Sequence, residues 1–503
     1  MSTVPGIAEP ASDSFATTPA ETLDPQDWDA MRALAHRMVD DAISYLQTVE
    51  ERPVWQEVPP TIAARFSAPA PHAPAGAEAA YAEFVETIFP YPMGNIHPRF
   101  WAWYMGNGTV MGALAELLAA TMNSNLGGGN HVANLVEGQV IDWMKTIMGL
   151  PATASGLLVS GGSMANLVGL AVARNIKAGF DIRDAGLHAA PQALVIYTSA
   201  EAHSSIQKAV ELLGLGSRNL RKISVNPDYT VDVTALAVAI AADRRAGLQP
   251  ICVVGTSGTI NTGAIDDLNA LADLCAQENL WFHVDGAIGA VGMLAPTLQP
   301  RLAGIERADS VALDLHKWLH IPFEAGCVLV RHEADHRHTF SLTPEYLEHN
   351  TRGLSAGQYW FSDYGVQLSR QFRALKVWMS IKEHGLDRFG QIMERNVAQA
   401  HYLGARIAAE PTLELTAPIG LDIVCFRYNP GGLDAPALNA LNKEILLQIH
   451  ERGNCAPSYT TLVGRYSLRV AIANHRSRQS DFDLLLAEVL ELGAALSSEL
   501  TLA

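Results

Sequence analysis

The 503-residue sequence contains little charge, and that charge is mostly of one sign. Charged residues make up 17% of the chain, with 35 Lys and Arg against 52 Asp and Glu, so the formal net charge is −17. Because no basic stripe interrupts this acidic balance, the sequence argues against nucleic acid or an anionic membrane as a partner. Hydrophobic residues make up 49%, which indicates a globular chain with a large core and two or three subdomains.

Cysteine and long apolar runs are also scarce. The five cysteines are an odd number without a Cys-x-x-Cys pair, so neither a disulfide framework nor a metal site is expected. Cysteines within apolar runs are predicted to fill core space, as in a protein of the reducing cytoplasm. The best candidate for a membrane span, residues 112–122, is short and contains Glu116, so none is expected. No basic region leads into an apolar one at the N-terminus, and no signal peptide is expected.

What the sequence does contain is a run of buried-strand patterns between residues 281 and 331. Three segments are short, rich in Val, Leu or aromatic residues, and bounded by Gly, Asp or Pro, which predicts strands. These strands are Trp281–Val284, Ser310–Leu313 and Gly326–Val330. Asp285 ends the first strand and Lys317 follows the second. Side chains at the carboxyl ends of strands in an open α/β sheet face one crevice, so the pair marks a candidate site. A surface aspartate and an ordinary surface lysine would give the same pattern.

Strands and helices alternate from about residue 155 to 331, which predicts an α/β fold with a mostly parallel sheet covered by helices on both faces. Within it, Gly161-Gly162-Ser163 follows a short strand and opens a helix that runs to about Lys177. Glycines at such a turn let backbone N–H groups approach an anion, and the helix dipole adds to the attraction. Taken alone, the pattern is more often only a helix cap.

The two ends of the chain follow other patterns. Asp24-Pro25 is predicted to open a helix with apolar residues at helical spacing as far as Leu46. From about residue 376 a long helix leads to short strands at 422–428 and 466–473, and then to a final helix at 481–496. This order predicts a small α+β domain.

The motifs resemble those of the group II amino-acid decarboxylases, which depend on pyridoxal 5'-phosphate (PLP) and include aromatic-L-amino-acid and glutamate decarboxylases. The resemblance rests on His-Val-Asp-x-Ala at residues 283–287 and on His316-Lys317-Trp318, with a separation of 317 − 285 = 32 residues. It covers about residues 26 to 496 and implies the type I fold of PLP enzymes, with a small C-terminal domain. It also implies that Lys317 holds PLP as a Schiff base and that Asp285 pairs with the pyridine nitrogen, so that the ring accepts electrons.

The resemblance implies further cofactor contacts. His203, in SAEAHSSIQKA, would stack on the cofactor ring, although a histidine that caps the next helix would look the same. Gly162 and Ser163 would bind the phosphate. Thr259 would lie beside the cofactor, and Ile260 follows it where relatives often carry Thr. The remaining implied contacts are Ala287, Asp314 and His316.

Three positions are implied to bind the substrate: Trp103, Gly128 and Ser369. Many aromatic-specific relatives carry a bulky residue near Gly128, so the pocket here is wider or is filled from elsewhere. Ser369 lies where the family carries Ser with phenolic and Gly with indolic substrates, which favours a tyrosine- or Dopa-like substrate. Arg370 and Arg373 follow it in SRQFRALK, and ion pairing at the start of a helix would explain them equally well.

Tyr346 lies in a Pro-x-Tyr-Leu motif. The resemblance places this motif on a mobile loop that closes over the active site of the other subunit, where the phenol returns a proton to the carbanion. The family carries Tyr in decarboxylases and Phe in aldehyde synthases, so Tyr346 predicts an amine product. A loop tyrosine that only packs would give the same sequence.

The sequence is therefore interpreted as a cytoplasmic, homodimeric decarboxylase of an L-amino acid, with an aromatic substrate favoured. Its predicted parts are a disordered tail at 1–25, an N-terminal dimer-packing segment at 26–109, a large PLP-binding domain at 110–375 and a small domain at 376–503. Three alternatives stay open. They are an acidic-amino-acid decarboxylase with Arg99 in a cationic pocket, an aldehyde synthase, and a PLP-free protein that keeps the fold for binding.

Overall fold

The computed structural model describes residues 22–342 and 350–502. Contacts divide them into a small unit, which ends at Gln47 and resumes over Ala68–Pro90, and a large unit that contains the rest. The small unit pairs α1 (Trp28–Gln47) with α3 (Ala77–Thr87). Helix α1 begins later than Asp24-Pro25, because the Asp27 carboxylate accepts the N–H groups of Asp29 and Ala30 and so caps the helix at Trp28.

The large unit contains a seven-stranded sheet in the order β2-β8-β7-β6-β5-β3-β4. Strands β4, β3, β5, β6 and β7 are parallel, while β8 runs antiparallel to both β7 and β2. This confirms the mostly parallel sheet and the three predicted strands around the candidate site. The strands are β2 (Ser155–Val159), β3 (Leu194–Ser199), β4 (Leu220–Ile223), β5 (Gln249–Thr256), β6 (Trp281–Asp285), β7 (Ser310–Asp314) and β8 (Gly326–Val330).

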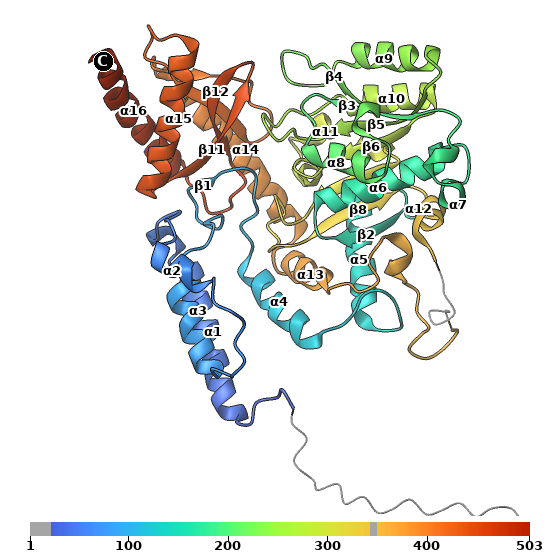
Figure 1. Ribbon diagram of the computed structural model, residues 1–503, viewed down its shortest axis with the longest axis horizontal. Helices are drawn as coiled ribbons and strands as arrows, with labels where there is room; N and C mark the ends of the chain where they lie inside the picture. The colour runs from blue at the N-terminus through green and yellow to red at the C-terminus, as the bar shows by residue number, and fades with distance from the viewer. Residues whose placement is uncertain (1–21, 343–349, 503) are drawn as a thin grey trace, which may run out of the picture. The chain divides into compact units, whose positions relative to one another are not determined.

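Helices cover both faces of this sheet (Figure 1). Side chains alternate along β6, so His283 meets α6 on one face while Phe282 packs near α10 on the other. Helix α6 lies across β5 to β8 with α8 beside it, and α9 and α10 pack on β4, β5 and β6. The helices of this part are α4 (Val110–Met122), α5 (Val132–Ile147), α6 (Gly162–Lys177), α7 (Ile182–Ala185), α8 (Ser204–Leu212), α9 (Val233–Arg245), α10 (Leu268–Glu278), α11 (Gln299–Leu302), α12 (Glu333–Phe340) and α13 (Arg373–His384), with α2 (Pro60–Arg65) before them.

A second sheet of five strands has the order β1-β11-β12-β10-β9. Its edge strand β1 is parallel to β11 and comes from residues 97–101, far from the other strands of this sheet in the sequence. Trp101 stacks on Phe482 at 5.1 Å and so anchors this edge to the C-terminal helix. The elements are β1 (Phe100–Trp101), β9 (Leu413–Leu415), β10 (Ile423–Tyr428), β11 (Ala456–Leu462), β12 (Arg465–Ala471), α14 (Leu386–Ala409), α15 (Ala435–Arg452) and α16 (Gln479–Leu502).

The cysteines lie in the core, which confirms the prediction made for those within apolar runs and extends it to all of them. All five are buried and free, so none forms a disulfide. Over residues 22–342 and 350–502, no helix is both long enough and apolar enough to cross a bilayer. The same residues contain no group of three or more His, Cys, Asp or Glu side chains arranged to hold a metal ion.

One buried carboxyl group predicts a pH-dependent stability. Asp422, just before β10, accepts a 2.8 Å hydrogen bond from Tyr104 Oη, and burial raises the pKa of Asp422 to about 7. The unfolded chain titrates near 3.9, so between these values the native state holds a proton that the unfolded state releases. Stability should therefore fall as pH rises across this window, by up to about 1.4 kcal/mol per pH unit. We expect Asp422→Asn to remove this fall, as measured by urea unfolding at pH 5 and pH 8. Equal pH dependence in the two proteins would contradict the assignment.

Candidate active site

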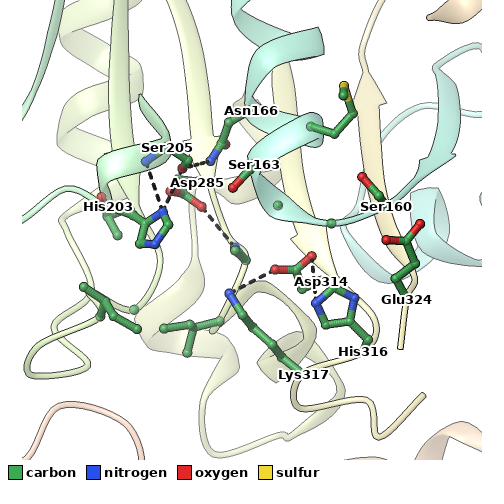
Figure 2. A pocket seen from close by; sticks show the side chains of 18 residues that line it. Ser160, Ser163, Asn166, His203, Ser205, Asp285, Asp314, His316, Lys317 and Glu324 are labelled. Atoms are coloured by element: carbon green, nitrogen blue, oxygen red, sulfur yellow. Dashed lines mark hydrogen bonds and ion pairs between the residues drawn. The ribbon is translucent and has the colours of Figure 1, made fainter. Parts of the chain in front are cut away.

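A pocket of about 340 Å³ lies at the carboxyl ends of the parallel strands (Figure 2). Strand β6 ends at Asp285 and its parallel neighbour β7 ends at Asp314, three residues before Lys317. Both Asp285 and Lys317 line this pocket, so the sheet brings together the two residues that the strand pattern singled out. The crevice has the position in which open α/β sheets bind their ligands.

The ionisable groups of the pocket include the carboxylates of Asp285, Asp314 and Glu324 and the amine of Lys317. Lys317 Nζ lies 2.9 Å from Asp314 Oδ2. Asp285 is 5% exposed, and burial raises its pKa, against the nearby charges of Lys317 and His203. Its Oδ1 accepts the backbone N–H of Ala287 at 3.3 Å. An amine and a buried carboxylate held in one crevice can bind a carbonyl compound and stabilise a cationic ring nitrogen.

The glycine turn between β2 and α6 forms one wall. A Cβ on Gly162 would lie 2.9 Å from Asp314 Oδ2, and one on Gly161 would lie 3.0 Å from His316 Cε1, so both positions lack room for a side chain. Gly162 and Ser163 begin α6, where backbone N–H groups have no partner within the helix. The turn is therefore shaped to receive an anion at a helix N-terminus.

His203 caps a helix and also lies in the pocket, where the predicted stacking on a cofactor ring stays a prediction. It caps α8, because its Nδ1 accepts the backbone N–H of Ser205 at 3.2 Å, and it also lines the pocket. Burial lowers the pKa of His203, although Asp285 opposes this effect. Burial likewise lowers the pKa of His316, whose Nδ1 accepts the N–H of Ala325 at 3.0 Å. Both imidazoles therefore favour the neutral form.

Most of the predicted cofactor contacts lie in this pocket, but one does not. The lining includes Gly162, Ser163, His203, Asp285, Ala287, Asp314, His316 and Lys317. Thr259 is turned into its own loop instead, where its Oγ1 lies 3.0 Å from Thr262 Oγ1 and accepts the N–H of Ala264. Ile260, rather than Thr259, contributes a side chain to the pocket.

The predicted substrate positions lie elsewhere in the chain. Trp103 is 54% exposed, Ser369 is exposed, and neither residue lines this pocket. Gly128 also lies outside it, with a position for Cβ only 2.2 Å from Trp360 Cε3, so Trp360 fills the space that Gly128 leaves. Tyr346 lies outside the described residues.

Arg370 and Arg373 form the ion pairs that their sequence position allowed. Arg370 pairs with Glu137 in the core, and Arg373 Nη2 lies 2.8 Å from Glu324 Oε1. The backbone of Arg370 also joins its segment to the loop that carries Gly128, because Arg370 N donates to Asn125 Oδ1 at 2.9 Å. The two stretches with Gly128 and Ser369 therefore lie side by side.

Several pocket residues were not predicted from the sequence. Asn166 lies three residues after Ser163 on α6, so helical spacing alone could have placed both on one face. Ser205 follows His203 at the start of α8. Glu324 reaches the pocket from the loop before β8, and no pattern in the sequence marks it.

Comparisons with known protein families, sequences and structures all identify proteins of the same kind. The family described as "Pyridoxal-dependent decarboxylase conserved domain" matches residues 60–429. An aromatic-L-amino-acid decarboxylase of Bacillus atrophaeus is 33% identical over 473 residues, which cover 93% of this chain and 96% of the relative. The crystal structure of Oryza sativa TDC with PLP and tryptamine has a TM-score of 0.87 at 26% identity, covering 94% of this chain and 100% of that one. The structure of a Rhodiola rosea 4-hydroxyphenylacetaldehyde synthase has a TM-score of 0.83 at 25% identity, covering 94% and 99%.

Proposed function

Because the chain belongs to the pyridoxal-dependent decarboxylases, and is therefore a PLP-dependent enzyme that decarboxylates an amino acid, we propose that its substrate is an aromatic L-amino acid and its product the amine. The observation that supports PLP chemistry at this site is the placement of Lys317 and Asp285 at the carboxyl ends of neighbouring parallel strands, beside a glycine turn. The curated relatives named for aromatic-L-amino-acid, tryptophan and tyrosine decarboxylation support the substrate class.

The donor groups of the pocket fit PLP. The first N–H groups of α6 and the Ser163 hydroxyl suit a phosphate, and the bare Gly161 and Gly162 leave room for it. Lys317 supplies the only amine among the pocket residues, and Asp285 supplies a buried carboxylate for the ring nitrogen. The imidazole of His203 would cover the ring.

In the proposed reaction the protein residues bind, orient and exclude water. PLP, when bound, draws electrons from the substrate α-carbon so that carbon dioxide can leave. Asp285 would offer its carboxylate to the ring nitrogen, and Lys317 Nζ would hold the cofactor through its aldehyde. His203 presents a neutral imidazole to the substrate. The Tyr346 phenol would return a proton to the α-carbon.

We also propose a homodimer in which each subunit completes the site of the other. The stretches that carry Gly128 and Ser369 lie outside their own chain's pocket, so a second copy offers them a site. Apolar side chains are exposed on α4 and at the start of α5, which supports a covering partner. They are Leu117, Leu118, Met122, Val132 and Leu135. A cytoplasmic location would suit the five free cysteines.

The acidic-substrate alternative has less support. Arg99, its candidate cation, donates to the carbonyl of Asn454 at 2.7 Å and lies 3.6 Å from Asp481 Oδ1, so its charge is already paired. It does not line the pocket of its own chain.

The test is to incubate the PLP-loaded protein with aromatic, acidic and aliphatic L-amino acids, and to measure carbon dioxide, amine and aldehyde together. Release of carbon dioxide and amine in equal amounts from aromatic substrates alone supports the proposal. Turnover of glutamate or aspartate in preference to aromatic substrates would overturn the substrate class.

We expect Tyr346→Phe to divert the product from amine towards aldehyde. Phenylalanine keeps the shape of the ring but has no proton to give, so protonation of the α-carbon would be slower and oxygen from the air could compete, giving aldehyde, ammonia and peroxide. Amine, aldehyde and peroxide are measured under air and again without oxygen. Unchanged amine output without peroxide would show that Tyr346 is not the proton donor.

A further inference from the structure

A continuous chain of hydrogen bonds leads from His203 into the core of the large sheet. His203 Nδ1 accepts the backbone N–H of Ser205 at 3.2 Å, so this ring nitrogen carries no proton. The Ser205 hydroxyl lies 2.8 Å from the same Nδ1 and must therefore donate to it. Asn166 Nδ2 in turn donates to Ser205 Oγ at 3.0 Å (Figure 2). The proton of a neutral His203 consequently lies on Nε2, on the ring edge that the helix leaves free.

The chain continues from Asn166 through β6 to β7. His283 Nε2 lies 2.9 Å from Asn166 Oδ1, which can only accept, so Nε2 carries a proton. Burial lowers the pKa of His283 to about 3, so the ring is neutral and its Nδ1 is bare. Ser310 Oγ, 2.8 Å from that Nδ1, donates to it and accepts the indole N–H of Trp281 at 2.8 Å. In every hydrogen bond of this chain, therefore, the donor lies on the side of the indole and the acceptor on the side of the pocket.

We propose that Ser205, Asn166 and His283 are positioning residues that hold His203 as a neutral imidazole, with its proton on Nε2 and facing the reacting groups. The part that His203 takes in the reaction rests on the proposed function. The position of the proton rests on the contacts alone, so the two can be tested separately.

The chain of hydrogen bonds also disfavours the protonated, cationic form of His203. An imidazolium needs a proton on Nδ1, where the backbone N–H of Ser205 already points, and two donors cannot bond to each other. Burial acts in the same direction. The charged groups that act on His203 are Asp285 and Asp314, which favour the cation, and Lys317 and Lys208, which disfavour it.

The chain of hydrogen bonds orients the imidazole of His203 but cannot conduct protons to it. The amide of Asn166 lies between Ser205 and His283 and does not gain or lose a proton at neutral pH. A proton that leaves His203 Nε2 must therefore return from the pocket side, from the substrate or from water.

Solid-state ¹⁵N NMR of the PLP-loaded protein, with both ring nitrogens of histidine labelled, tests the assignment. The His203 signals are identified by their loss in His203→Gln. We expect a bare Nδ1 and a protonated Nε2, and we expect Ser205→Ala to shift Nδ1 towards the value of an imidazole that accepts fewer hydrogen bonds. A protonated Nδ1 in the wild type, or a Nδ1 shift that Ser205→Ala does not change, would overturn the inference.

Variants of His283 test the effect on the reaction. His283→Phe breaks the chain, whereas His283→Gln restores it, because the amide offers an acceptor to Ser310 and a donor to Asn166. For the loss of one buried hydrogen bond we expect His283→Phe to show mixed tautomers at His203 and a kcat about tenfold lower, with KM changed less than about twofold. His283→Gln should recover kcat to within about threefold.

Trp281→Phe is the matched control on the same strand. It removes only the outermost donor, so kcat and the His203 spectrum should stay near the wild type. Equal losses of kcat in His283→Phe and Trp281→Phe, with unchanged ¹⁵N signals of His203, would contradict the inference. The hydrogen-bonded side chains would then serve only to pack the core. If His283→Phe does not fold, the ¹⁵N spectra of the wild type and of Ser205→Ala still show which ring nitrogen of His203 carries the proton. A protein with the expected spectrum that decarboxylates no amino acid would instead overturn the proposed function.

Discussion

Replacement of Lys317 by alanine is expected to abolish turnover and the visible absorbance band of bound PLP. Lys317 carries the only amine among the 18 pocket residues, so no other side chain there can condense with the cofactor aldehyde. Absorbance after gel filtration and carbon dioxide release from an aromatic amino acid measure the two effects.

One further variant separates the amine of Lys317 from its charge, and a second variant is a control for loss of a lysine elsewhere. Lys317→Arg keeps a cation next to Asp314, which lies 2.9 Å from Nζ, but a guanidinium does not form the covalent link. It should fold normally and remain inactive. Lys222→Ala removes an exposed lysine from β4 and should keep full activity. Turnover by Lys317→Ala at the wild-type rate would show that the amine is not required.

The largest effect on stability is expected from breaking the Glu137–Arg370 pair. The two side chains are 0% and 1% exposed, and Arg370 also donates to the carbonyls of Leu126 and Leu158 at 2.8 and 2.7 Å. Removal of one partner leaves a buried charge without compensation, so Arg370→Met or Glu137→Leu should each cost about 3–5 kcal/mol. Urea unfolding at a fixed protein concentration measures the loss.

The double variant Glu137→Leu/Arg370→Met is the control for this pair. Because it leaves no unpaired charge, its loss should be smaller than the sum of the two single losses. Strictly additive losses would mean that the charges do not interact. Since Arg370 holds Leu158 just before the glycine turn, the single variants should also bind PLP more weakly.

The sequence predicted the residues that end strands and failed for contacts between distant segments. Asp285, Lys317 and Gly162 could be placed because short apolar runs bounded by Gly, Asp or Pro mark where buried strands end, and parallel strands end at one edge of the sheet. The chain from Trp281 to His203 could not be predicted, because it joins four elements whose spacing carries no pattern. Thr259 could not be oriented, because its direction depends on a turn that closes on Thr262.

The smaller sheet shows the same limit. Strands β10 and β12 were predicted from their apolar runs, but β1 has only two residues and pairs with β11 from the other end of the chain. A two-residue strand has no period to detect. Its place is determined by the burial of Trp101 against Phe482, a contact that only the folded chain reveals.

Positions 128 and 360 constrain each other, so a redesign of the enzyme must change both together. The indole of Trp360 occupies the volume that a side chain at position 128 would need, with 2.2 Å between the added Cβ and Cε3. A library that varies position 128 alone would therefore yield mainly misfolded protein, whereas one that also shrinks position 360 can exchange the source of the aromatic ring.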